Sequence, residues 1–174
     1  MLATIPDDGK RYEIIDGELL VTPAGSNAHQ RAAGRLFALL LPYVDSINLD
    51  ILIAPADVPL SPRTLVQPDV FVLPRIGGRF ATKFADVGQL ILAVEILSPS
   101  SARSDRHKKR VLYQNERVPE YWIVDVDART IERWTPDSTE AALLTTSFLW
   151  KPTTDEALII DVEEFFRSVA GNAS

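Results

Sequence analysis

The sequence predicts a mixed α/β or α+β domain in which a central β-sheet is flanked by helices. Three observations lead to this fold class. Strand-like and helix-like segments alternate along the chain, prolines separate most of them, and one strand-like segment is apolar almost throughout. With 174 residues, 46% of them hydrophobic and 24% charged, the chain has the size and composition of one globular domain spanning residues 1–174.

Each element follows from a local pattern. The expected order is a hairpin at 12–21, a helix at 26–44, strands at 47–55, 63–74 and 89–98, a loop and helix at 98–117, strands at 120–126 and 129–135, and a strand and helix at 158–169. Asp16-Gly17 between two apolar runs favours a tight hairpin turn. The first helix has small and apolar residues at helical spacing, Ser26 or Asn27 as its cap, and Pro42 at its end.

The later elements are read in the same way. The apolar segment at 89–98 suits the centre of the sheet. Ser104 or Asp105 can cap the helix that follows it, and the next two strands turn around Asp127-Ala128. The last segment is a short strand and an amphipathic helix, after which Gly171–Ser174 is expected to be a frayed tail.

Composition excludes several classes of protein. Without cysteine there is no disulfide, zinc–thiolate site, iron–sulfur cluster or cysteine nucleophile, and two histidines are too few for a three-histidine metal site. The first ten residues lack the pattern of a secretory signal, and no apolar stretch reaches the length of a membrane span, so a cytoplasmic protein without membrane contact is expected. The net charge of −6 argues against a broad nucleic-acid-binding surface but allows a local basic patch.

Two acidic residues lie in strand-like segments that are otherwise apolar. Asp69 follows Pro68 in one of them, and Glu95 lies in the still more apolar segment that comes next. A charged group in such a place costs roughly several kcal/mol unless it is paired or binds a cation. Two such carboxylates on neighbouring strands would form a site for Mg²⁺ or Mn²⁺, to which Glu18 would add a third. In the alternative, each acid is exposed, lies at a strand end or pairs with a basic residue.

A local excess of basic residues follows directly. Residues 103–117 contain Arg103, Arg106, Lys108, Lys109, Arg110 and Arg117, against Asp105 and Glu116. A helix there would place positive charge beside the acidic pair, and phosphodiester cleavage needs both. Charge alone favours the alternative of a solvated helix face with Asp105 and Lys109 as an i,i+4 pair.

Other candidates carry less chemistry. His29 and His107 are expected on polar helix faces, with a role as base or phosphate contact as the alternative. Ser98, Ser100 and Ser101 lack the G-x-S-x-G elbow of a serine hydrolase, and no phosphate-binding glycine loop occurs. The tyrosines and tryptophans of the strand-like segments are expected to pack in the core rather than stack on bases.

Several of these residues together resemble a known family. The motifs Pro68-Asp69, VEILSPSS, Asp105 with Lys109 and Tyr113, and VPEYWIVD are similar to those of the Uma-two family of restriction endonucleases from cyanobacteria and other bacteria, within the PD-(D/E)XK nuclease superfamily. The resemblance covers about residues 10–135. It implies a restriction-endonuclease-like central mixed β-sheet flanked by helices, and a Mg²⁺- or Mn²⁺-dependent endonuclease that hydrolyses phosphodiester bonds, with DNA favoured.

The resemblance also implies the metal ligands. Asp69 matches the aspartate that binds the metal, and Glu95 matches the acidic residue of the second strand. The backbone carbonyl of Ile96 would be a further ligand. Glu18 matches an acidic position before the first helix and would complete the set.

The lysine of the superfamily pattern is displaced in this chain. Two residues after the glutamate the sequence has Leu97, which cannot orient water or stabilise charge. In the family this lysine lies on the following helix, where Lys109 matches its spacing and Lys108 is the alternative. The lysine would orient the attacking water or add positive charge at the phosphate. Arg103, Arg106 and Lys108 would hold neighbouring phosphates of the nucleic acid.

Two further functions stay open. Leu97 and the net negative charge also suit a nucleic-acid-binding module that keeps the nuclease fold without cleavage. A small-molecule phosphoesterase would share only the metal chemistry. The sequence does not choose between DNA and RNA, and a homodimer would suit a duplex because two strands have to be cut.

Overall fold

A six-stranded sheet forms the centre of the molecule in the computed structural model, which describes residues 8–171. The expected tail at 172–174 lies outside the described residues. The strands are β3 (Leu49–Ile53), β6 (Val70–Pro74), β7 (Leu92–Ile96), β8 (Glu120–Asp125), β9 (Thr130–Trp134) and β10 (Ala142–Leu144). They are arranged in the order β10-β9-β8-β7-β6-β3, and only β7 and β8 run parallel.

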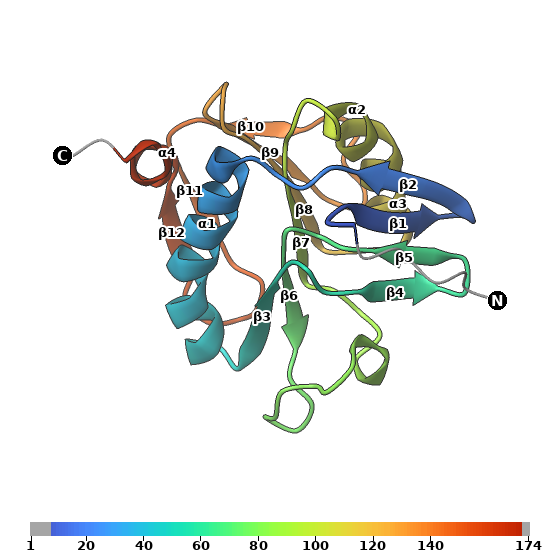
Figure 1. Ribbon diagram of the computed structural model, residues 1–174. Coiled ribbons are helices and arrows are strands. Elements are labelled where there is room, and N and C mark those ends of the chain that lie inside the picture. The colour runs from blue at the N-terminus through green and yellow to red at the C-terminus, as the bar shows by residue number, and fades with distance from the viewer. Residues whose placement is uncertain (1–7, 172–174) are drawn as a thin grey trace.

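Helices and a small hairpin cover one face of this sheet (Figure 1). They are α1 (Asn27–Ser46), α4 (Val162–Ala170), β11 (Ser147–Trp150) and β12 (Leu158–Asp161). The core on this side is built around aromatic side chains: Trp122 packs edge to face on Trp150, with 5.5 Å between ring centroids. Burial of this large apolar surface is the main stabilising contribution on this side.

A second sheet and a broken helix cover the other face (Figure 1). This sheet has the order β2-β1-β5-β4 and is antiparallel. Its strands are β1 (Arg11–Ile15), β2 (Glu18–Thr22), β4 (Val58–Ser61) and β5 (Thr64–Val66). The broken helix consists of α2 (Ala102–Ser104), the π-helical turn η2 (Asp105–Lys109) and α3 (Arg110–Asn115), while a short 3₁₀ turn, η1 (Phe84–Asp86), precedes β7.

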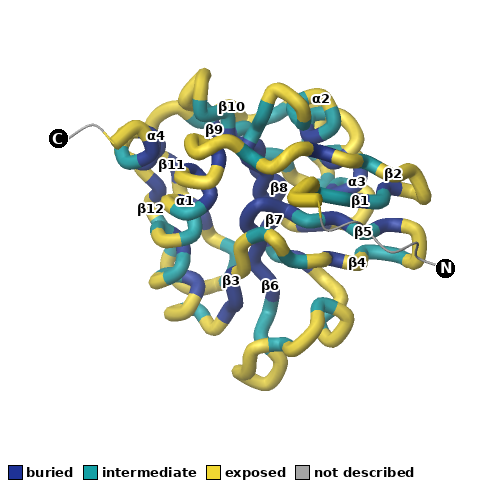
Figure 2. The backbone as a smooth tube through the Cα atoms, viewed as in Figure 1, coloured by how far each residue is buried: buried dark blue, intermediate teal, exposed yellow. Residues whose placement is uncertain are grey.

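The strand period of two decides which core each side chain enters. Along β7, Leu92, Val94 and Ile96 enter the core under α1, whereas Ala93 enters the core under the second sheet. Glu95 therefore points toward the second sheet. It is buried, like most of the central strands β6, β7 and β8 (Figure 2).

The predicted fold class is confirmed, as are most elements. The hairpin turns at Asp16 and Gly17 with φ of 53° and 86°, and the Ser26 hydroxyl accepts a hydrogen bond from the His29 N–H as the cap of α1. The placement of Pro42 at the end of this helix is wrong, because α1 continues to Ser46. A proline near a helix end removes one backbone hydrogen bond without stopping the chain from completing its last turn.

Two other expectations are corrected. The single strand expected at 63–74 is two strands, β5 and β6, in different sheets, and Pro68 lies in the link between them. Ser104 and Asp105 do not cap a helix, since helical structure begins at Ala102 and Asp105 is buried within η2. In residues 8–171 no helix is long and apolar enough to cross a membrane.

Candidate active site

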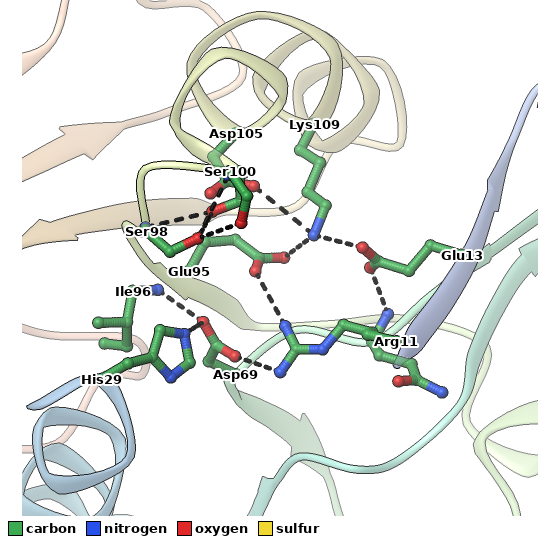
Figure 3. Close-up of polar contacts among 12 residues, drawn as sticks. Arg11, Glu13, His29, Asp69, Glu95, Ile96, Ser98, Ser100, Asp105 and Lys109 are labelled. Carbon is green, nitrogen blue, oxygen red and sulfur yellow. Dashed lines mark hydrogen bonds and ion pairs between the residues drawn. The ribbon is translucent and has the colours of Figure 1, made fainter. Parts of the chain in front are cut away.

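Asp69 and Glu95, the two carboxylates singled out in the sequence, lie together between the central sheet and the second sheet (Figure 3). We call them the carboxylate pair. Asp69 directly precedes β6, and its N–H donates to the Val94 carbonyl at 3.0 Å, which continues the pairing of β6 with β7. Each residue is only 2% exposed. Asp69 lies between Arg11 of β1 and His29 of α1, and Glu95 lies between Arg11 and Lys109.

Three donors hold the Asp69 carboxylate. Arg11 Nη2 donates to Oδ1 at 2.6 Å, while His29 Nε2 lies 3.0 Å and the Ile96 N–H 2.7 Å from Oδ2. Burial by itself raises the pKa of Asp69, but the His29 hydrogen bond, the Arg11 charge and the Ile96 N–H together hold this pKa below its usual value. Asp69 is therefore kept as a carboxylate in a place where water is scarce.

Glu95 is bound to a buried lysine. Its Oε1 accepts hydrogen bonds from Lys109 Nζ at 2.9 Å and from the Tyr113 hydroxyl at 3.3 Å, while its Oε2 lies 3.9 Å from Arg11 Nη1. Burial raises the pKa of Glu95 well above its usual value, and neighbouring carboxylates add to the rise while Lys109 opposes it.

Lys109 is the centre of a larger ionic cluster. Besides Glu95 it lies 2.8 Å from Glu13 Oε2 and 3.6 Å from Asp105 Oδ1, and its side chain is 2% exposed. Burial alone would lower the pKa of Lys109, but the surrounding carboxylates raise it above its usual value. The lysine therefore stays charged, and it links β1, β7 and η2 (Figure 3).

Local structure explains why these side chains meet. Alternation along β1 turns Arg11, Glu13 and Ile15 to the same inner face. In η2 the first and last residues, Asp105 and Lys109, are both buried. π-Helical turns are rare and are frequently found at functional sites.

The cluster contains more negative than positive groups. Four buried carboxylates, those of Glu13, Asp69, Glu95 and Asp105, surround the two permanent cations Arg11 and Lys109. Both oxygens of Asp105 are buried without a hydrogen-bond partner among the described residues, and the nearest cation to Oδ1 is Lys109 Nζ at 3.6 Å. Buried carboxylates in excess either take up protons or attract a further cation.

The donor set suits a hard divalent cation that keeps part of its water shell. Asp69 Oδ1 and Glu95 Oε2 both face the Arg11 guanidinium, which shows that one cationic group can contact both carboxylates. No three acidic or histidine side chains of residues 8–171 are grouped around a single metal position. Mg²⁺ commonly binds one or two carboxylates and takes its other ligands from water and phosphate, so the pair fits this ion.

Some predicted ligands lie elsewhere. Glu18 has a side chain that is 72% exposed and pairs with Lys108 at 2.6 Å, because it lies beyond the Asp16-Gly17 turn on β2. The structure thus does not bring Glu18 or Lys108 to the carboxylate pair, whereas it does bring Lys109 there. Ile96 meets Asp69 through its N–H.

The residues predicted to hold phosphates differ in their surroundings. Arg106 donates to Glu132 at 2.7 Å and to Asp125 at 3.2 Å. Arg103 forms no ion pair within the described part of the chain and lines a surface hollow beside α2 and η2. Arg103 is therefore the one of the three predicted phosphate contacts that has no carboxylate partner in residues 8–171.

Three residues of the site were not identified from the sequence: Arg11, Glu13 and His29. The expectation of a surface position for His29 is wrong, since this residue is 7% exposed and contacts Asp69. Gly25 makes this possible, because a Cβ at that position would lie 2.5 Å from His29 Nδ1. Alternation in RYEII does not reveal the inward positions of the other two, because it favours the apolar Tyr12 and Ile14 as the inner residues and the charged Arg11 and Glu13 as the outer ones.

Comparisons with known proteins give a family and a fold. A family model, Uma2, described as "Putative restriction endonuclease", matches residues 2–167, a longer span than the 10–135 expected from the motifs. A solved structure described as "a putative nuclease belonging to DUF820" from Anabaena variabilis matches with a TM-score of 0.76 and 18% identity, over 95% of this chain and 94% of that one. A search of curated proteins found no match.

Proposed function

This chain belongs to the Uma2 family, and from that membership we propose that it is a Mg²⁺- or Mn²⁺-dependent endonuclease that hydrolyses phosphodiester bonds in DNA. One observation carries the proposal: two buried carboxylates from neighbouring strands face one position, with a buried lysine bound to one of them. Maintaining such a cluster is costly for folding alone, which supports a catalytic role. We place this activity in the cytoplasm, where bacterial DNA is found.

In this proposal Asp69 and Glu95 hold the metal. Their oxygens Oδ1 and Oε2 already face a common cation, and oxygen donors are those that Mg²⁺ prefers. A Mg²⁺ ion bound there would supply polarisation of the phosphoryl group and a water of lowered pKa. His29 and the Ile96 N–H fix the orientation of Asp69 through Oδ2, so that Oδ1 would be available to hold the metal ion.

Lys109 supplies the positive charge that the strand itself lacks at Leu97. Its ammonium lies 2.9 Å from Glu95 Oε1 and arrives from η2 instead of from β7. Its charge opposes the rise that burial causes in the pKa of Glu95, and it adds positive charge next to the position of the reacting phosphate. Glu13 takes the third acidic position that was expected of Glu18, and it holds Lys109 from the opposite side.

DNA contacts beyond the reacting phosphate come from the helix side. Arg103 is the first candidate for a neighbouring phosphate, and Arg106 and Lys108 would exchange their present carboxylate partners for phosphates. Cleavage of both strands of a duplex would involve two copies of the chain.

A supercoiled-plasmid assay tests the proposal. The wild-type protein is incubated with Mg²⁺, with Mn²⁺ and with EDTA, beside the Asp69→Asn variant and a Glu18→Gln control whose side chain is exposed. We expect metal-dependent nicking that is lost in Asp69→Asn and kept in Glu18→Gln. Equal cutting by the wild type and Asp69→Asn would assign the activity to a contaminant and would refute the proposal.

A second candidate is a nucleic-acid-binding module that has lost cleavage. Arg11 contacts both members of the carboxylate pair, and Leu97 replaces the strand lysine, which together favour this alternative. A DNA gel shift beside the plasmid assay separates the two, and calorimetric titration with Mn²⁺ shows whether the module keeps a metal site. Wild-type protein that shifts DNA in a gel but does not cut it would establish the module, and retained Mn²⁺ binding without cleavage would support it as well.

A further inference from the structure

We propose that Arg11 is an exchangeable counter-ion, which neutralises the carboxylate pair without metal and moves to the substrate phosphate when the metal binds. This inference rests on the proposed metal-dependent function and assigns Arg11 a role that neither the motifs nor the comparisons give it.

The contacts of Arg11 are those expected of a group at the metal position. Nη2 lies 2.6 Å from Asp69 Oδ1 and Nη1 lies 3.9 Å from Glu95 Oε2 (Figure 3). The other oxygen of each carboxylate is already bound, in Asp69 by His29 and the Ile96 N–H, and in Glu95 by Lys109. A metal ion bridging the pair therefore has to use the two oxygens that Arg11 now faces.

The exchange follows from electrostatics. A guanidinium stays protonated under all ordinary conditions, so it cannot make way for the metal by losing its charge. Two cations cannot share the same two carboxylate oxygens, and the side chain has to rotate away. The loss of one positive charge is then more than offset by the two charges of the metal ion, in a cluster that has excess carboxylates.

The surroundings of Arg11 leave room for this movement. Its side chain is 20% exposed, and it lines a hollow of about 360 Å³ together with Lys10, Gly25, Gln30 and Gln67. No carboxylate of residues 8–171 lines this hollow, and Lys10, which does line it, is paired with Asp8 at 2.9 Å. A released guanidinium therefore has no acidic partner among the described residues that line the hollow. An anionic group next to the metal position is what this arrangement would bind, and in a nuclease that group is the phosphate.

Mn²⁺ titration by calorimetry tests the exchange. The proteins are the wild type, Arg11→Met and a control, Arg117→Met, which removes an arginine from an exposed pair with Asp137. Since the metal no longer competes with a charged hydrogen-bonding group, we expect Arg11→Met to bind Mn²⁺ at least about tenfold more tightly than the wild type. The control is expected to match the wild type. Equal or weaker Mn²⁺ binding by Arg11→Met would overturn the proposal.

Cleavage at saturating Mn²⁺ tests the proposed contact between Arg11 and the substrate phosphate. We expect Arg11→Met to cut plasmid about 100-fold more slowly than the wild type, although it binds metal more tightly, because the phosphate has lost a charged donor. Unchanged cleavage would refute the phosphate role. A residue with a merely structural role would weaken metal binding and cleavage together.

A measurement on the wild-type protein keeps the test open if Arg11→Met does not fold. The Nε–H resonance of Arg11, assigned by its absence from Arg11→Lys, is followed by NMR during titration with Mg²⁺. We expect a shift that saturates with the metal, as the guanidinium leaves Asp69. A resonance that stays fixed while Mg²⁺ supports cleavage would overturn the exchange and leave the nuclease proposal standing. Absence of metal binding and of cleavage in all proteins would refute both.

Discussion

Replacing Lys109 by methionine is the most informative single change, because within residues 8–171 this lysine forms ion pairs with three carboxylates at once. Nζ lies 2.8 Å from Glu13, 2.9 Å from Glu95 and 3.6 Å from Asp105. At 4 Å, one pair of unit charges is worth about 4 kcal/mol at an effective dielectric constant of about 20, against which the desolvation of the charges must be set. Removal of one partner from a buried ion pair costs about 3–5 kcal/mol in measured cases.

Proton uptake limits this cost. Burial raises the pKa of Glu95 and of Asp105, and loss of the lysine raises both further, so these groups take up protons instead of staying charged and unpaired. We therefore expect a loss of about 3 kcal/mol at neutral pH. At about 2–4 °C per kcal/mol for a chain of this length, the melting temperature falls by about 6–12 °C.

The sign of the pH dependence follows from the same pKa shifts. The raised pKa of Lys109 keeps its contribution intact below the usual lysine pKa of about 10.4, and the contribution is lost only at strongly alkaline pH. Toward acidic pH the carboxyls become neutral in both proteins, so the difference in stability between the wild type and Lys109→Met shrinks as the pH falls.

Urea unfolding and the plasmid assay together decide this prediction. Lys108→Met is the matched control, since Lys108 is the neighbouring lysine and pairs only with the exposed Glu18 in the described part of the chain. We expect Lys108→Met to unfold like the wild type, and Lys109→Met to lose both stability and cleavage. If the two variants have the same unfolding midpoint, the reasoning about the buried cluster is refuted.

Three further changes test other parts of the structure. Gly25→Ala is expected to push His29 away from Asp69, because the new Cβ would lie 2.5 Å from His29 Nδ1. Cleavage is then expected to slow on the order of 100-fold with little change in melting temperature, and an unchanged cleavage rate would contradict this. Gly34→Ala, in α1 with nothing within 4 Å of the added Cβ, is expected to raise stability by about 0.5–1 kcal/mol in urea unfolding, and a loss would show strain at that position. Burial raises the pKa of Asp50, so the ionised form of this residue destabilises the fold. Asp50→Asn is therefore expected to raise the melting temperature at pH 7, and this gain is expected to fade as the pH falls toward about 3.9. A gain that does not depend on pH would point to another cause.

The position of the lysine shows how the same chemistry can arise from a different element. Two residues after Glu95, directly after the end of β7, lies Leu97, which packs against the core under the second sheet. The ammonium instead arrives from η2, whose π-helical turn buries Asp105 and Lys109 together. A site built in this way depends on the packing of the broken helix against β1 and β7, so a change in that packing is expected to affect stability and activity together.

Much of the fold was determined by the sequence alone, because its signals are local. The Asp16-Gly17 turn, the Ser26 cap and the apolar run of β7 depend on neighbours in the chain, and they are found where they were expected. The cost of a charge in an apolar strand likewise makes Asp69 and Glu95 conspicuous in the sequence, since each lies among apolar neighbours.

Only the tertiary structure decided which side chains meet at the site. Arg11 reaches Asp69 across 58 positions of sequence, and His29 reaches it across 40. A buried polar group is stabilised by the partners that the packed sheets bring within about 3 Å of it. A local sequence pattern does not indicate which distant strand or helix will supply those partners. For this reason the sequence identified the carboxylate pair but did not show that Glu18 lies exposed beside Lys108, and it gave no sign that Arg11 contacts both carboxylates.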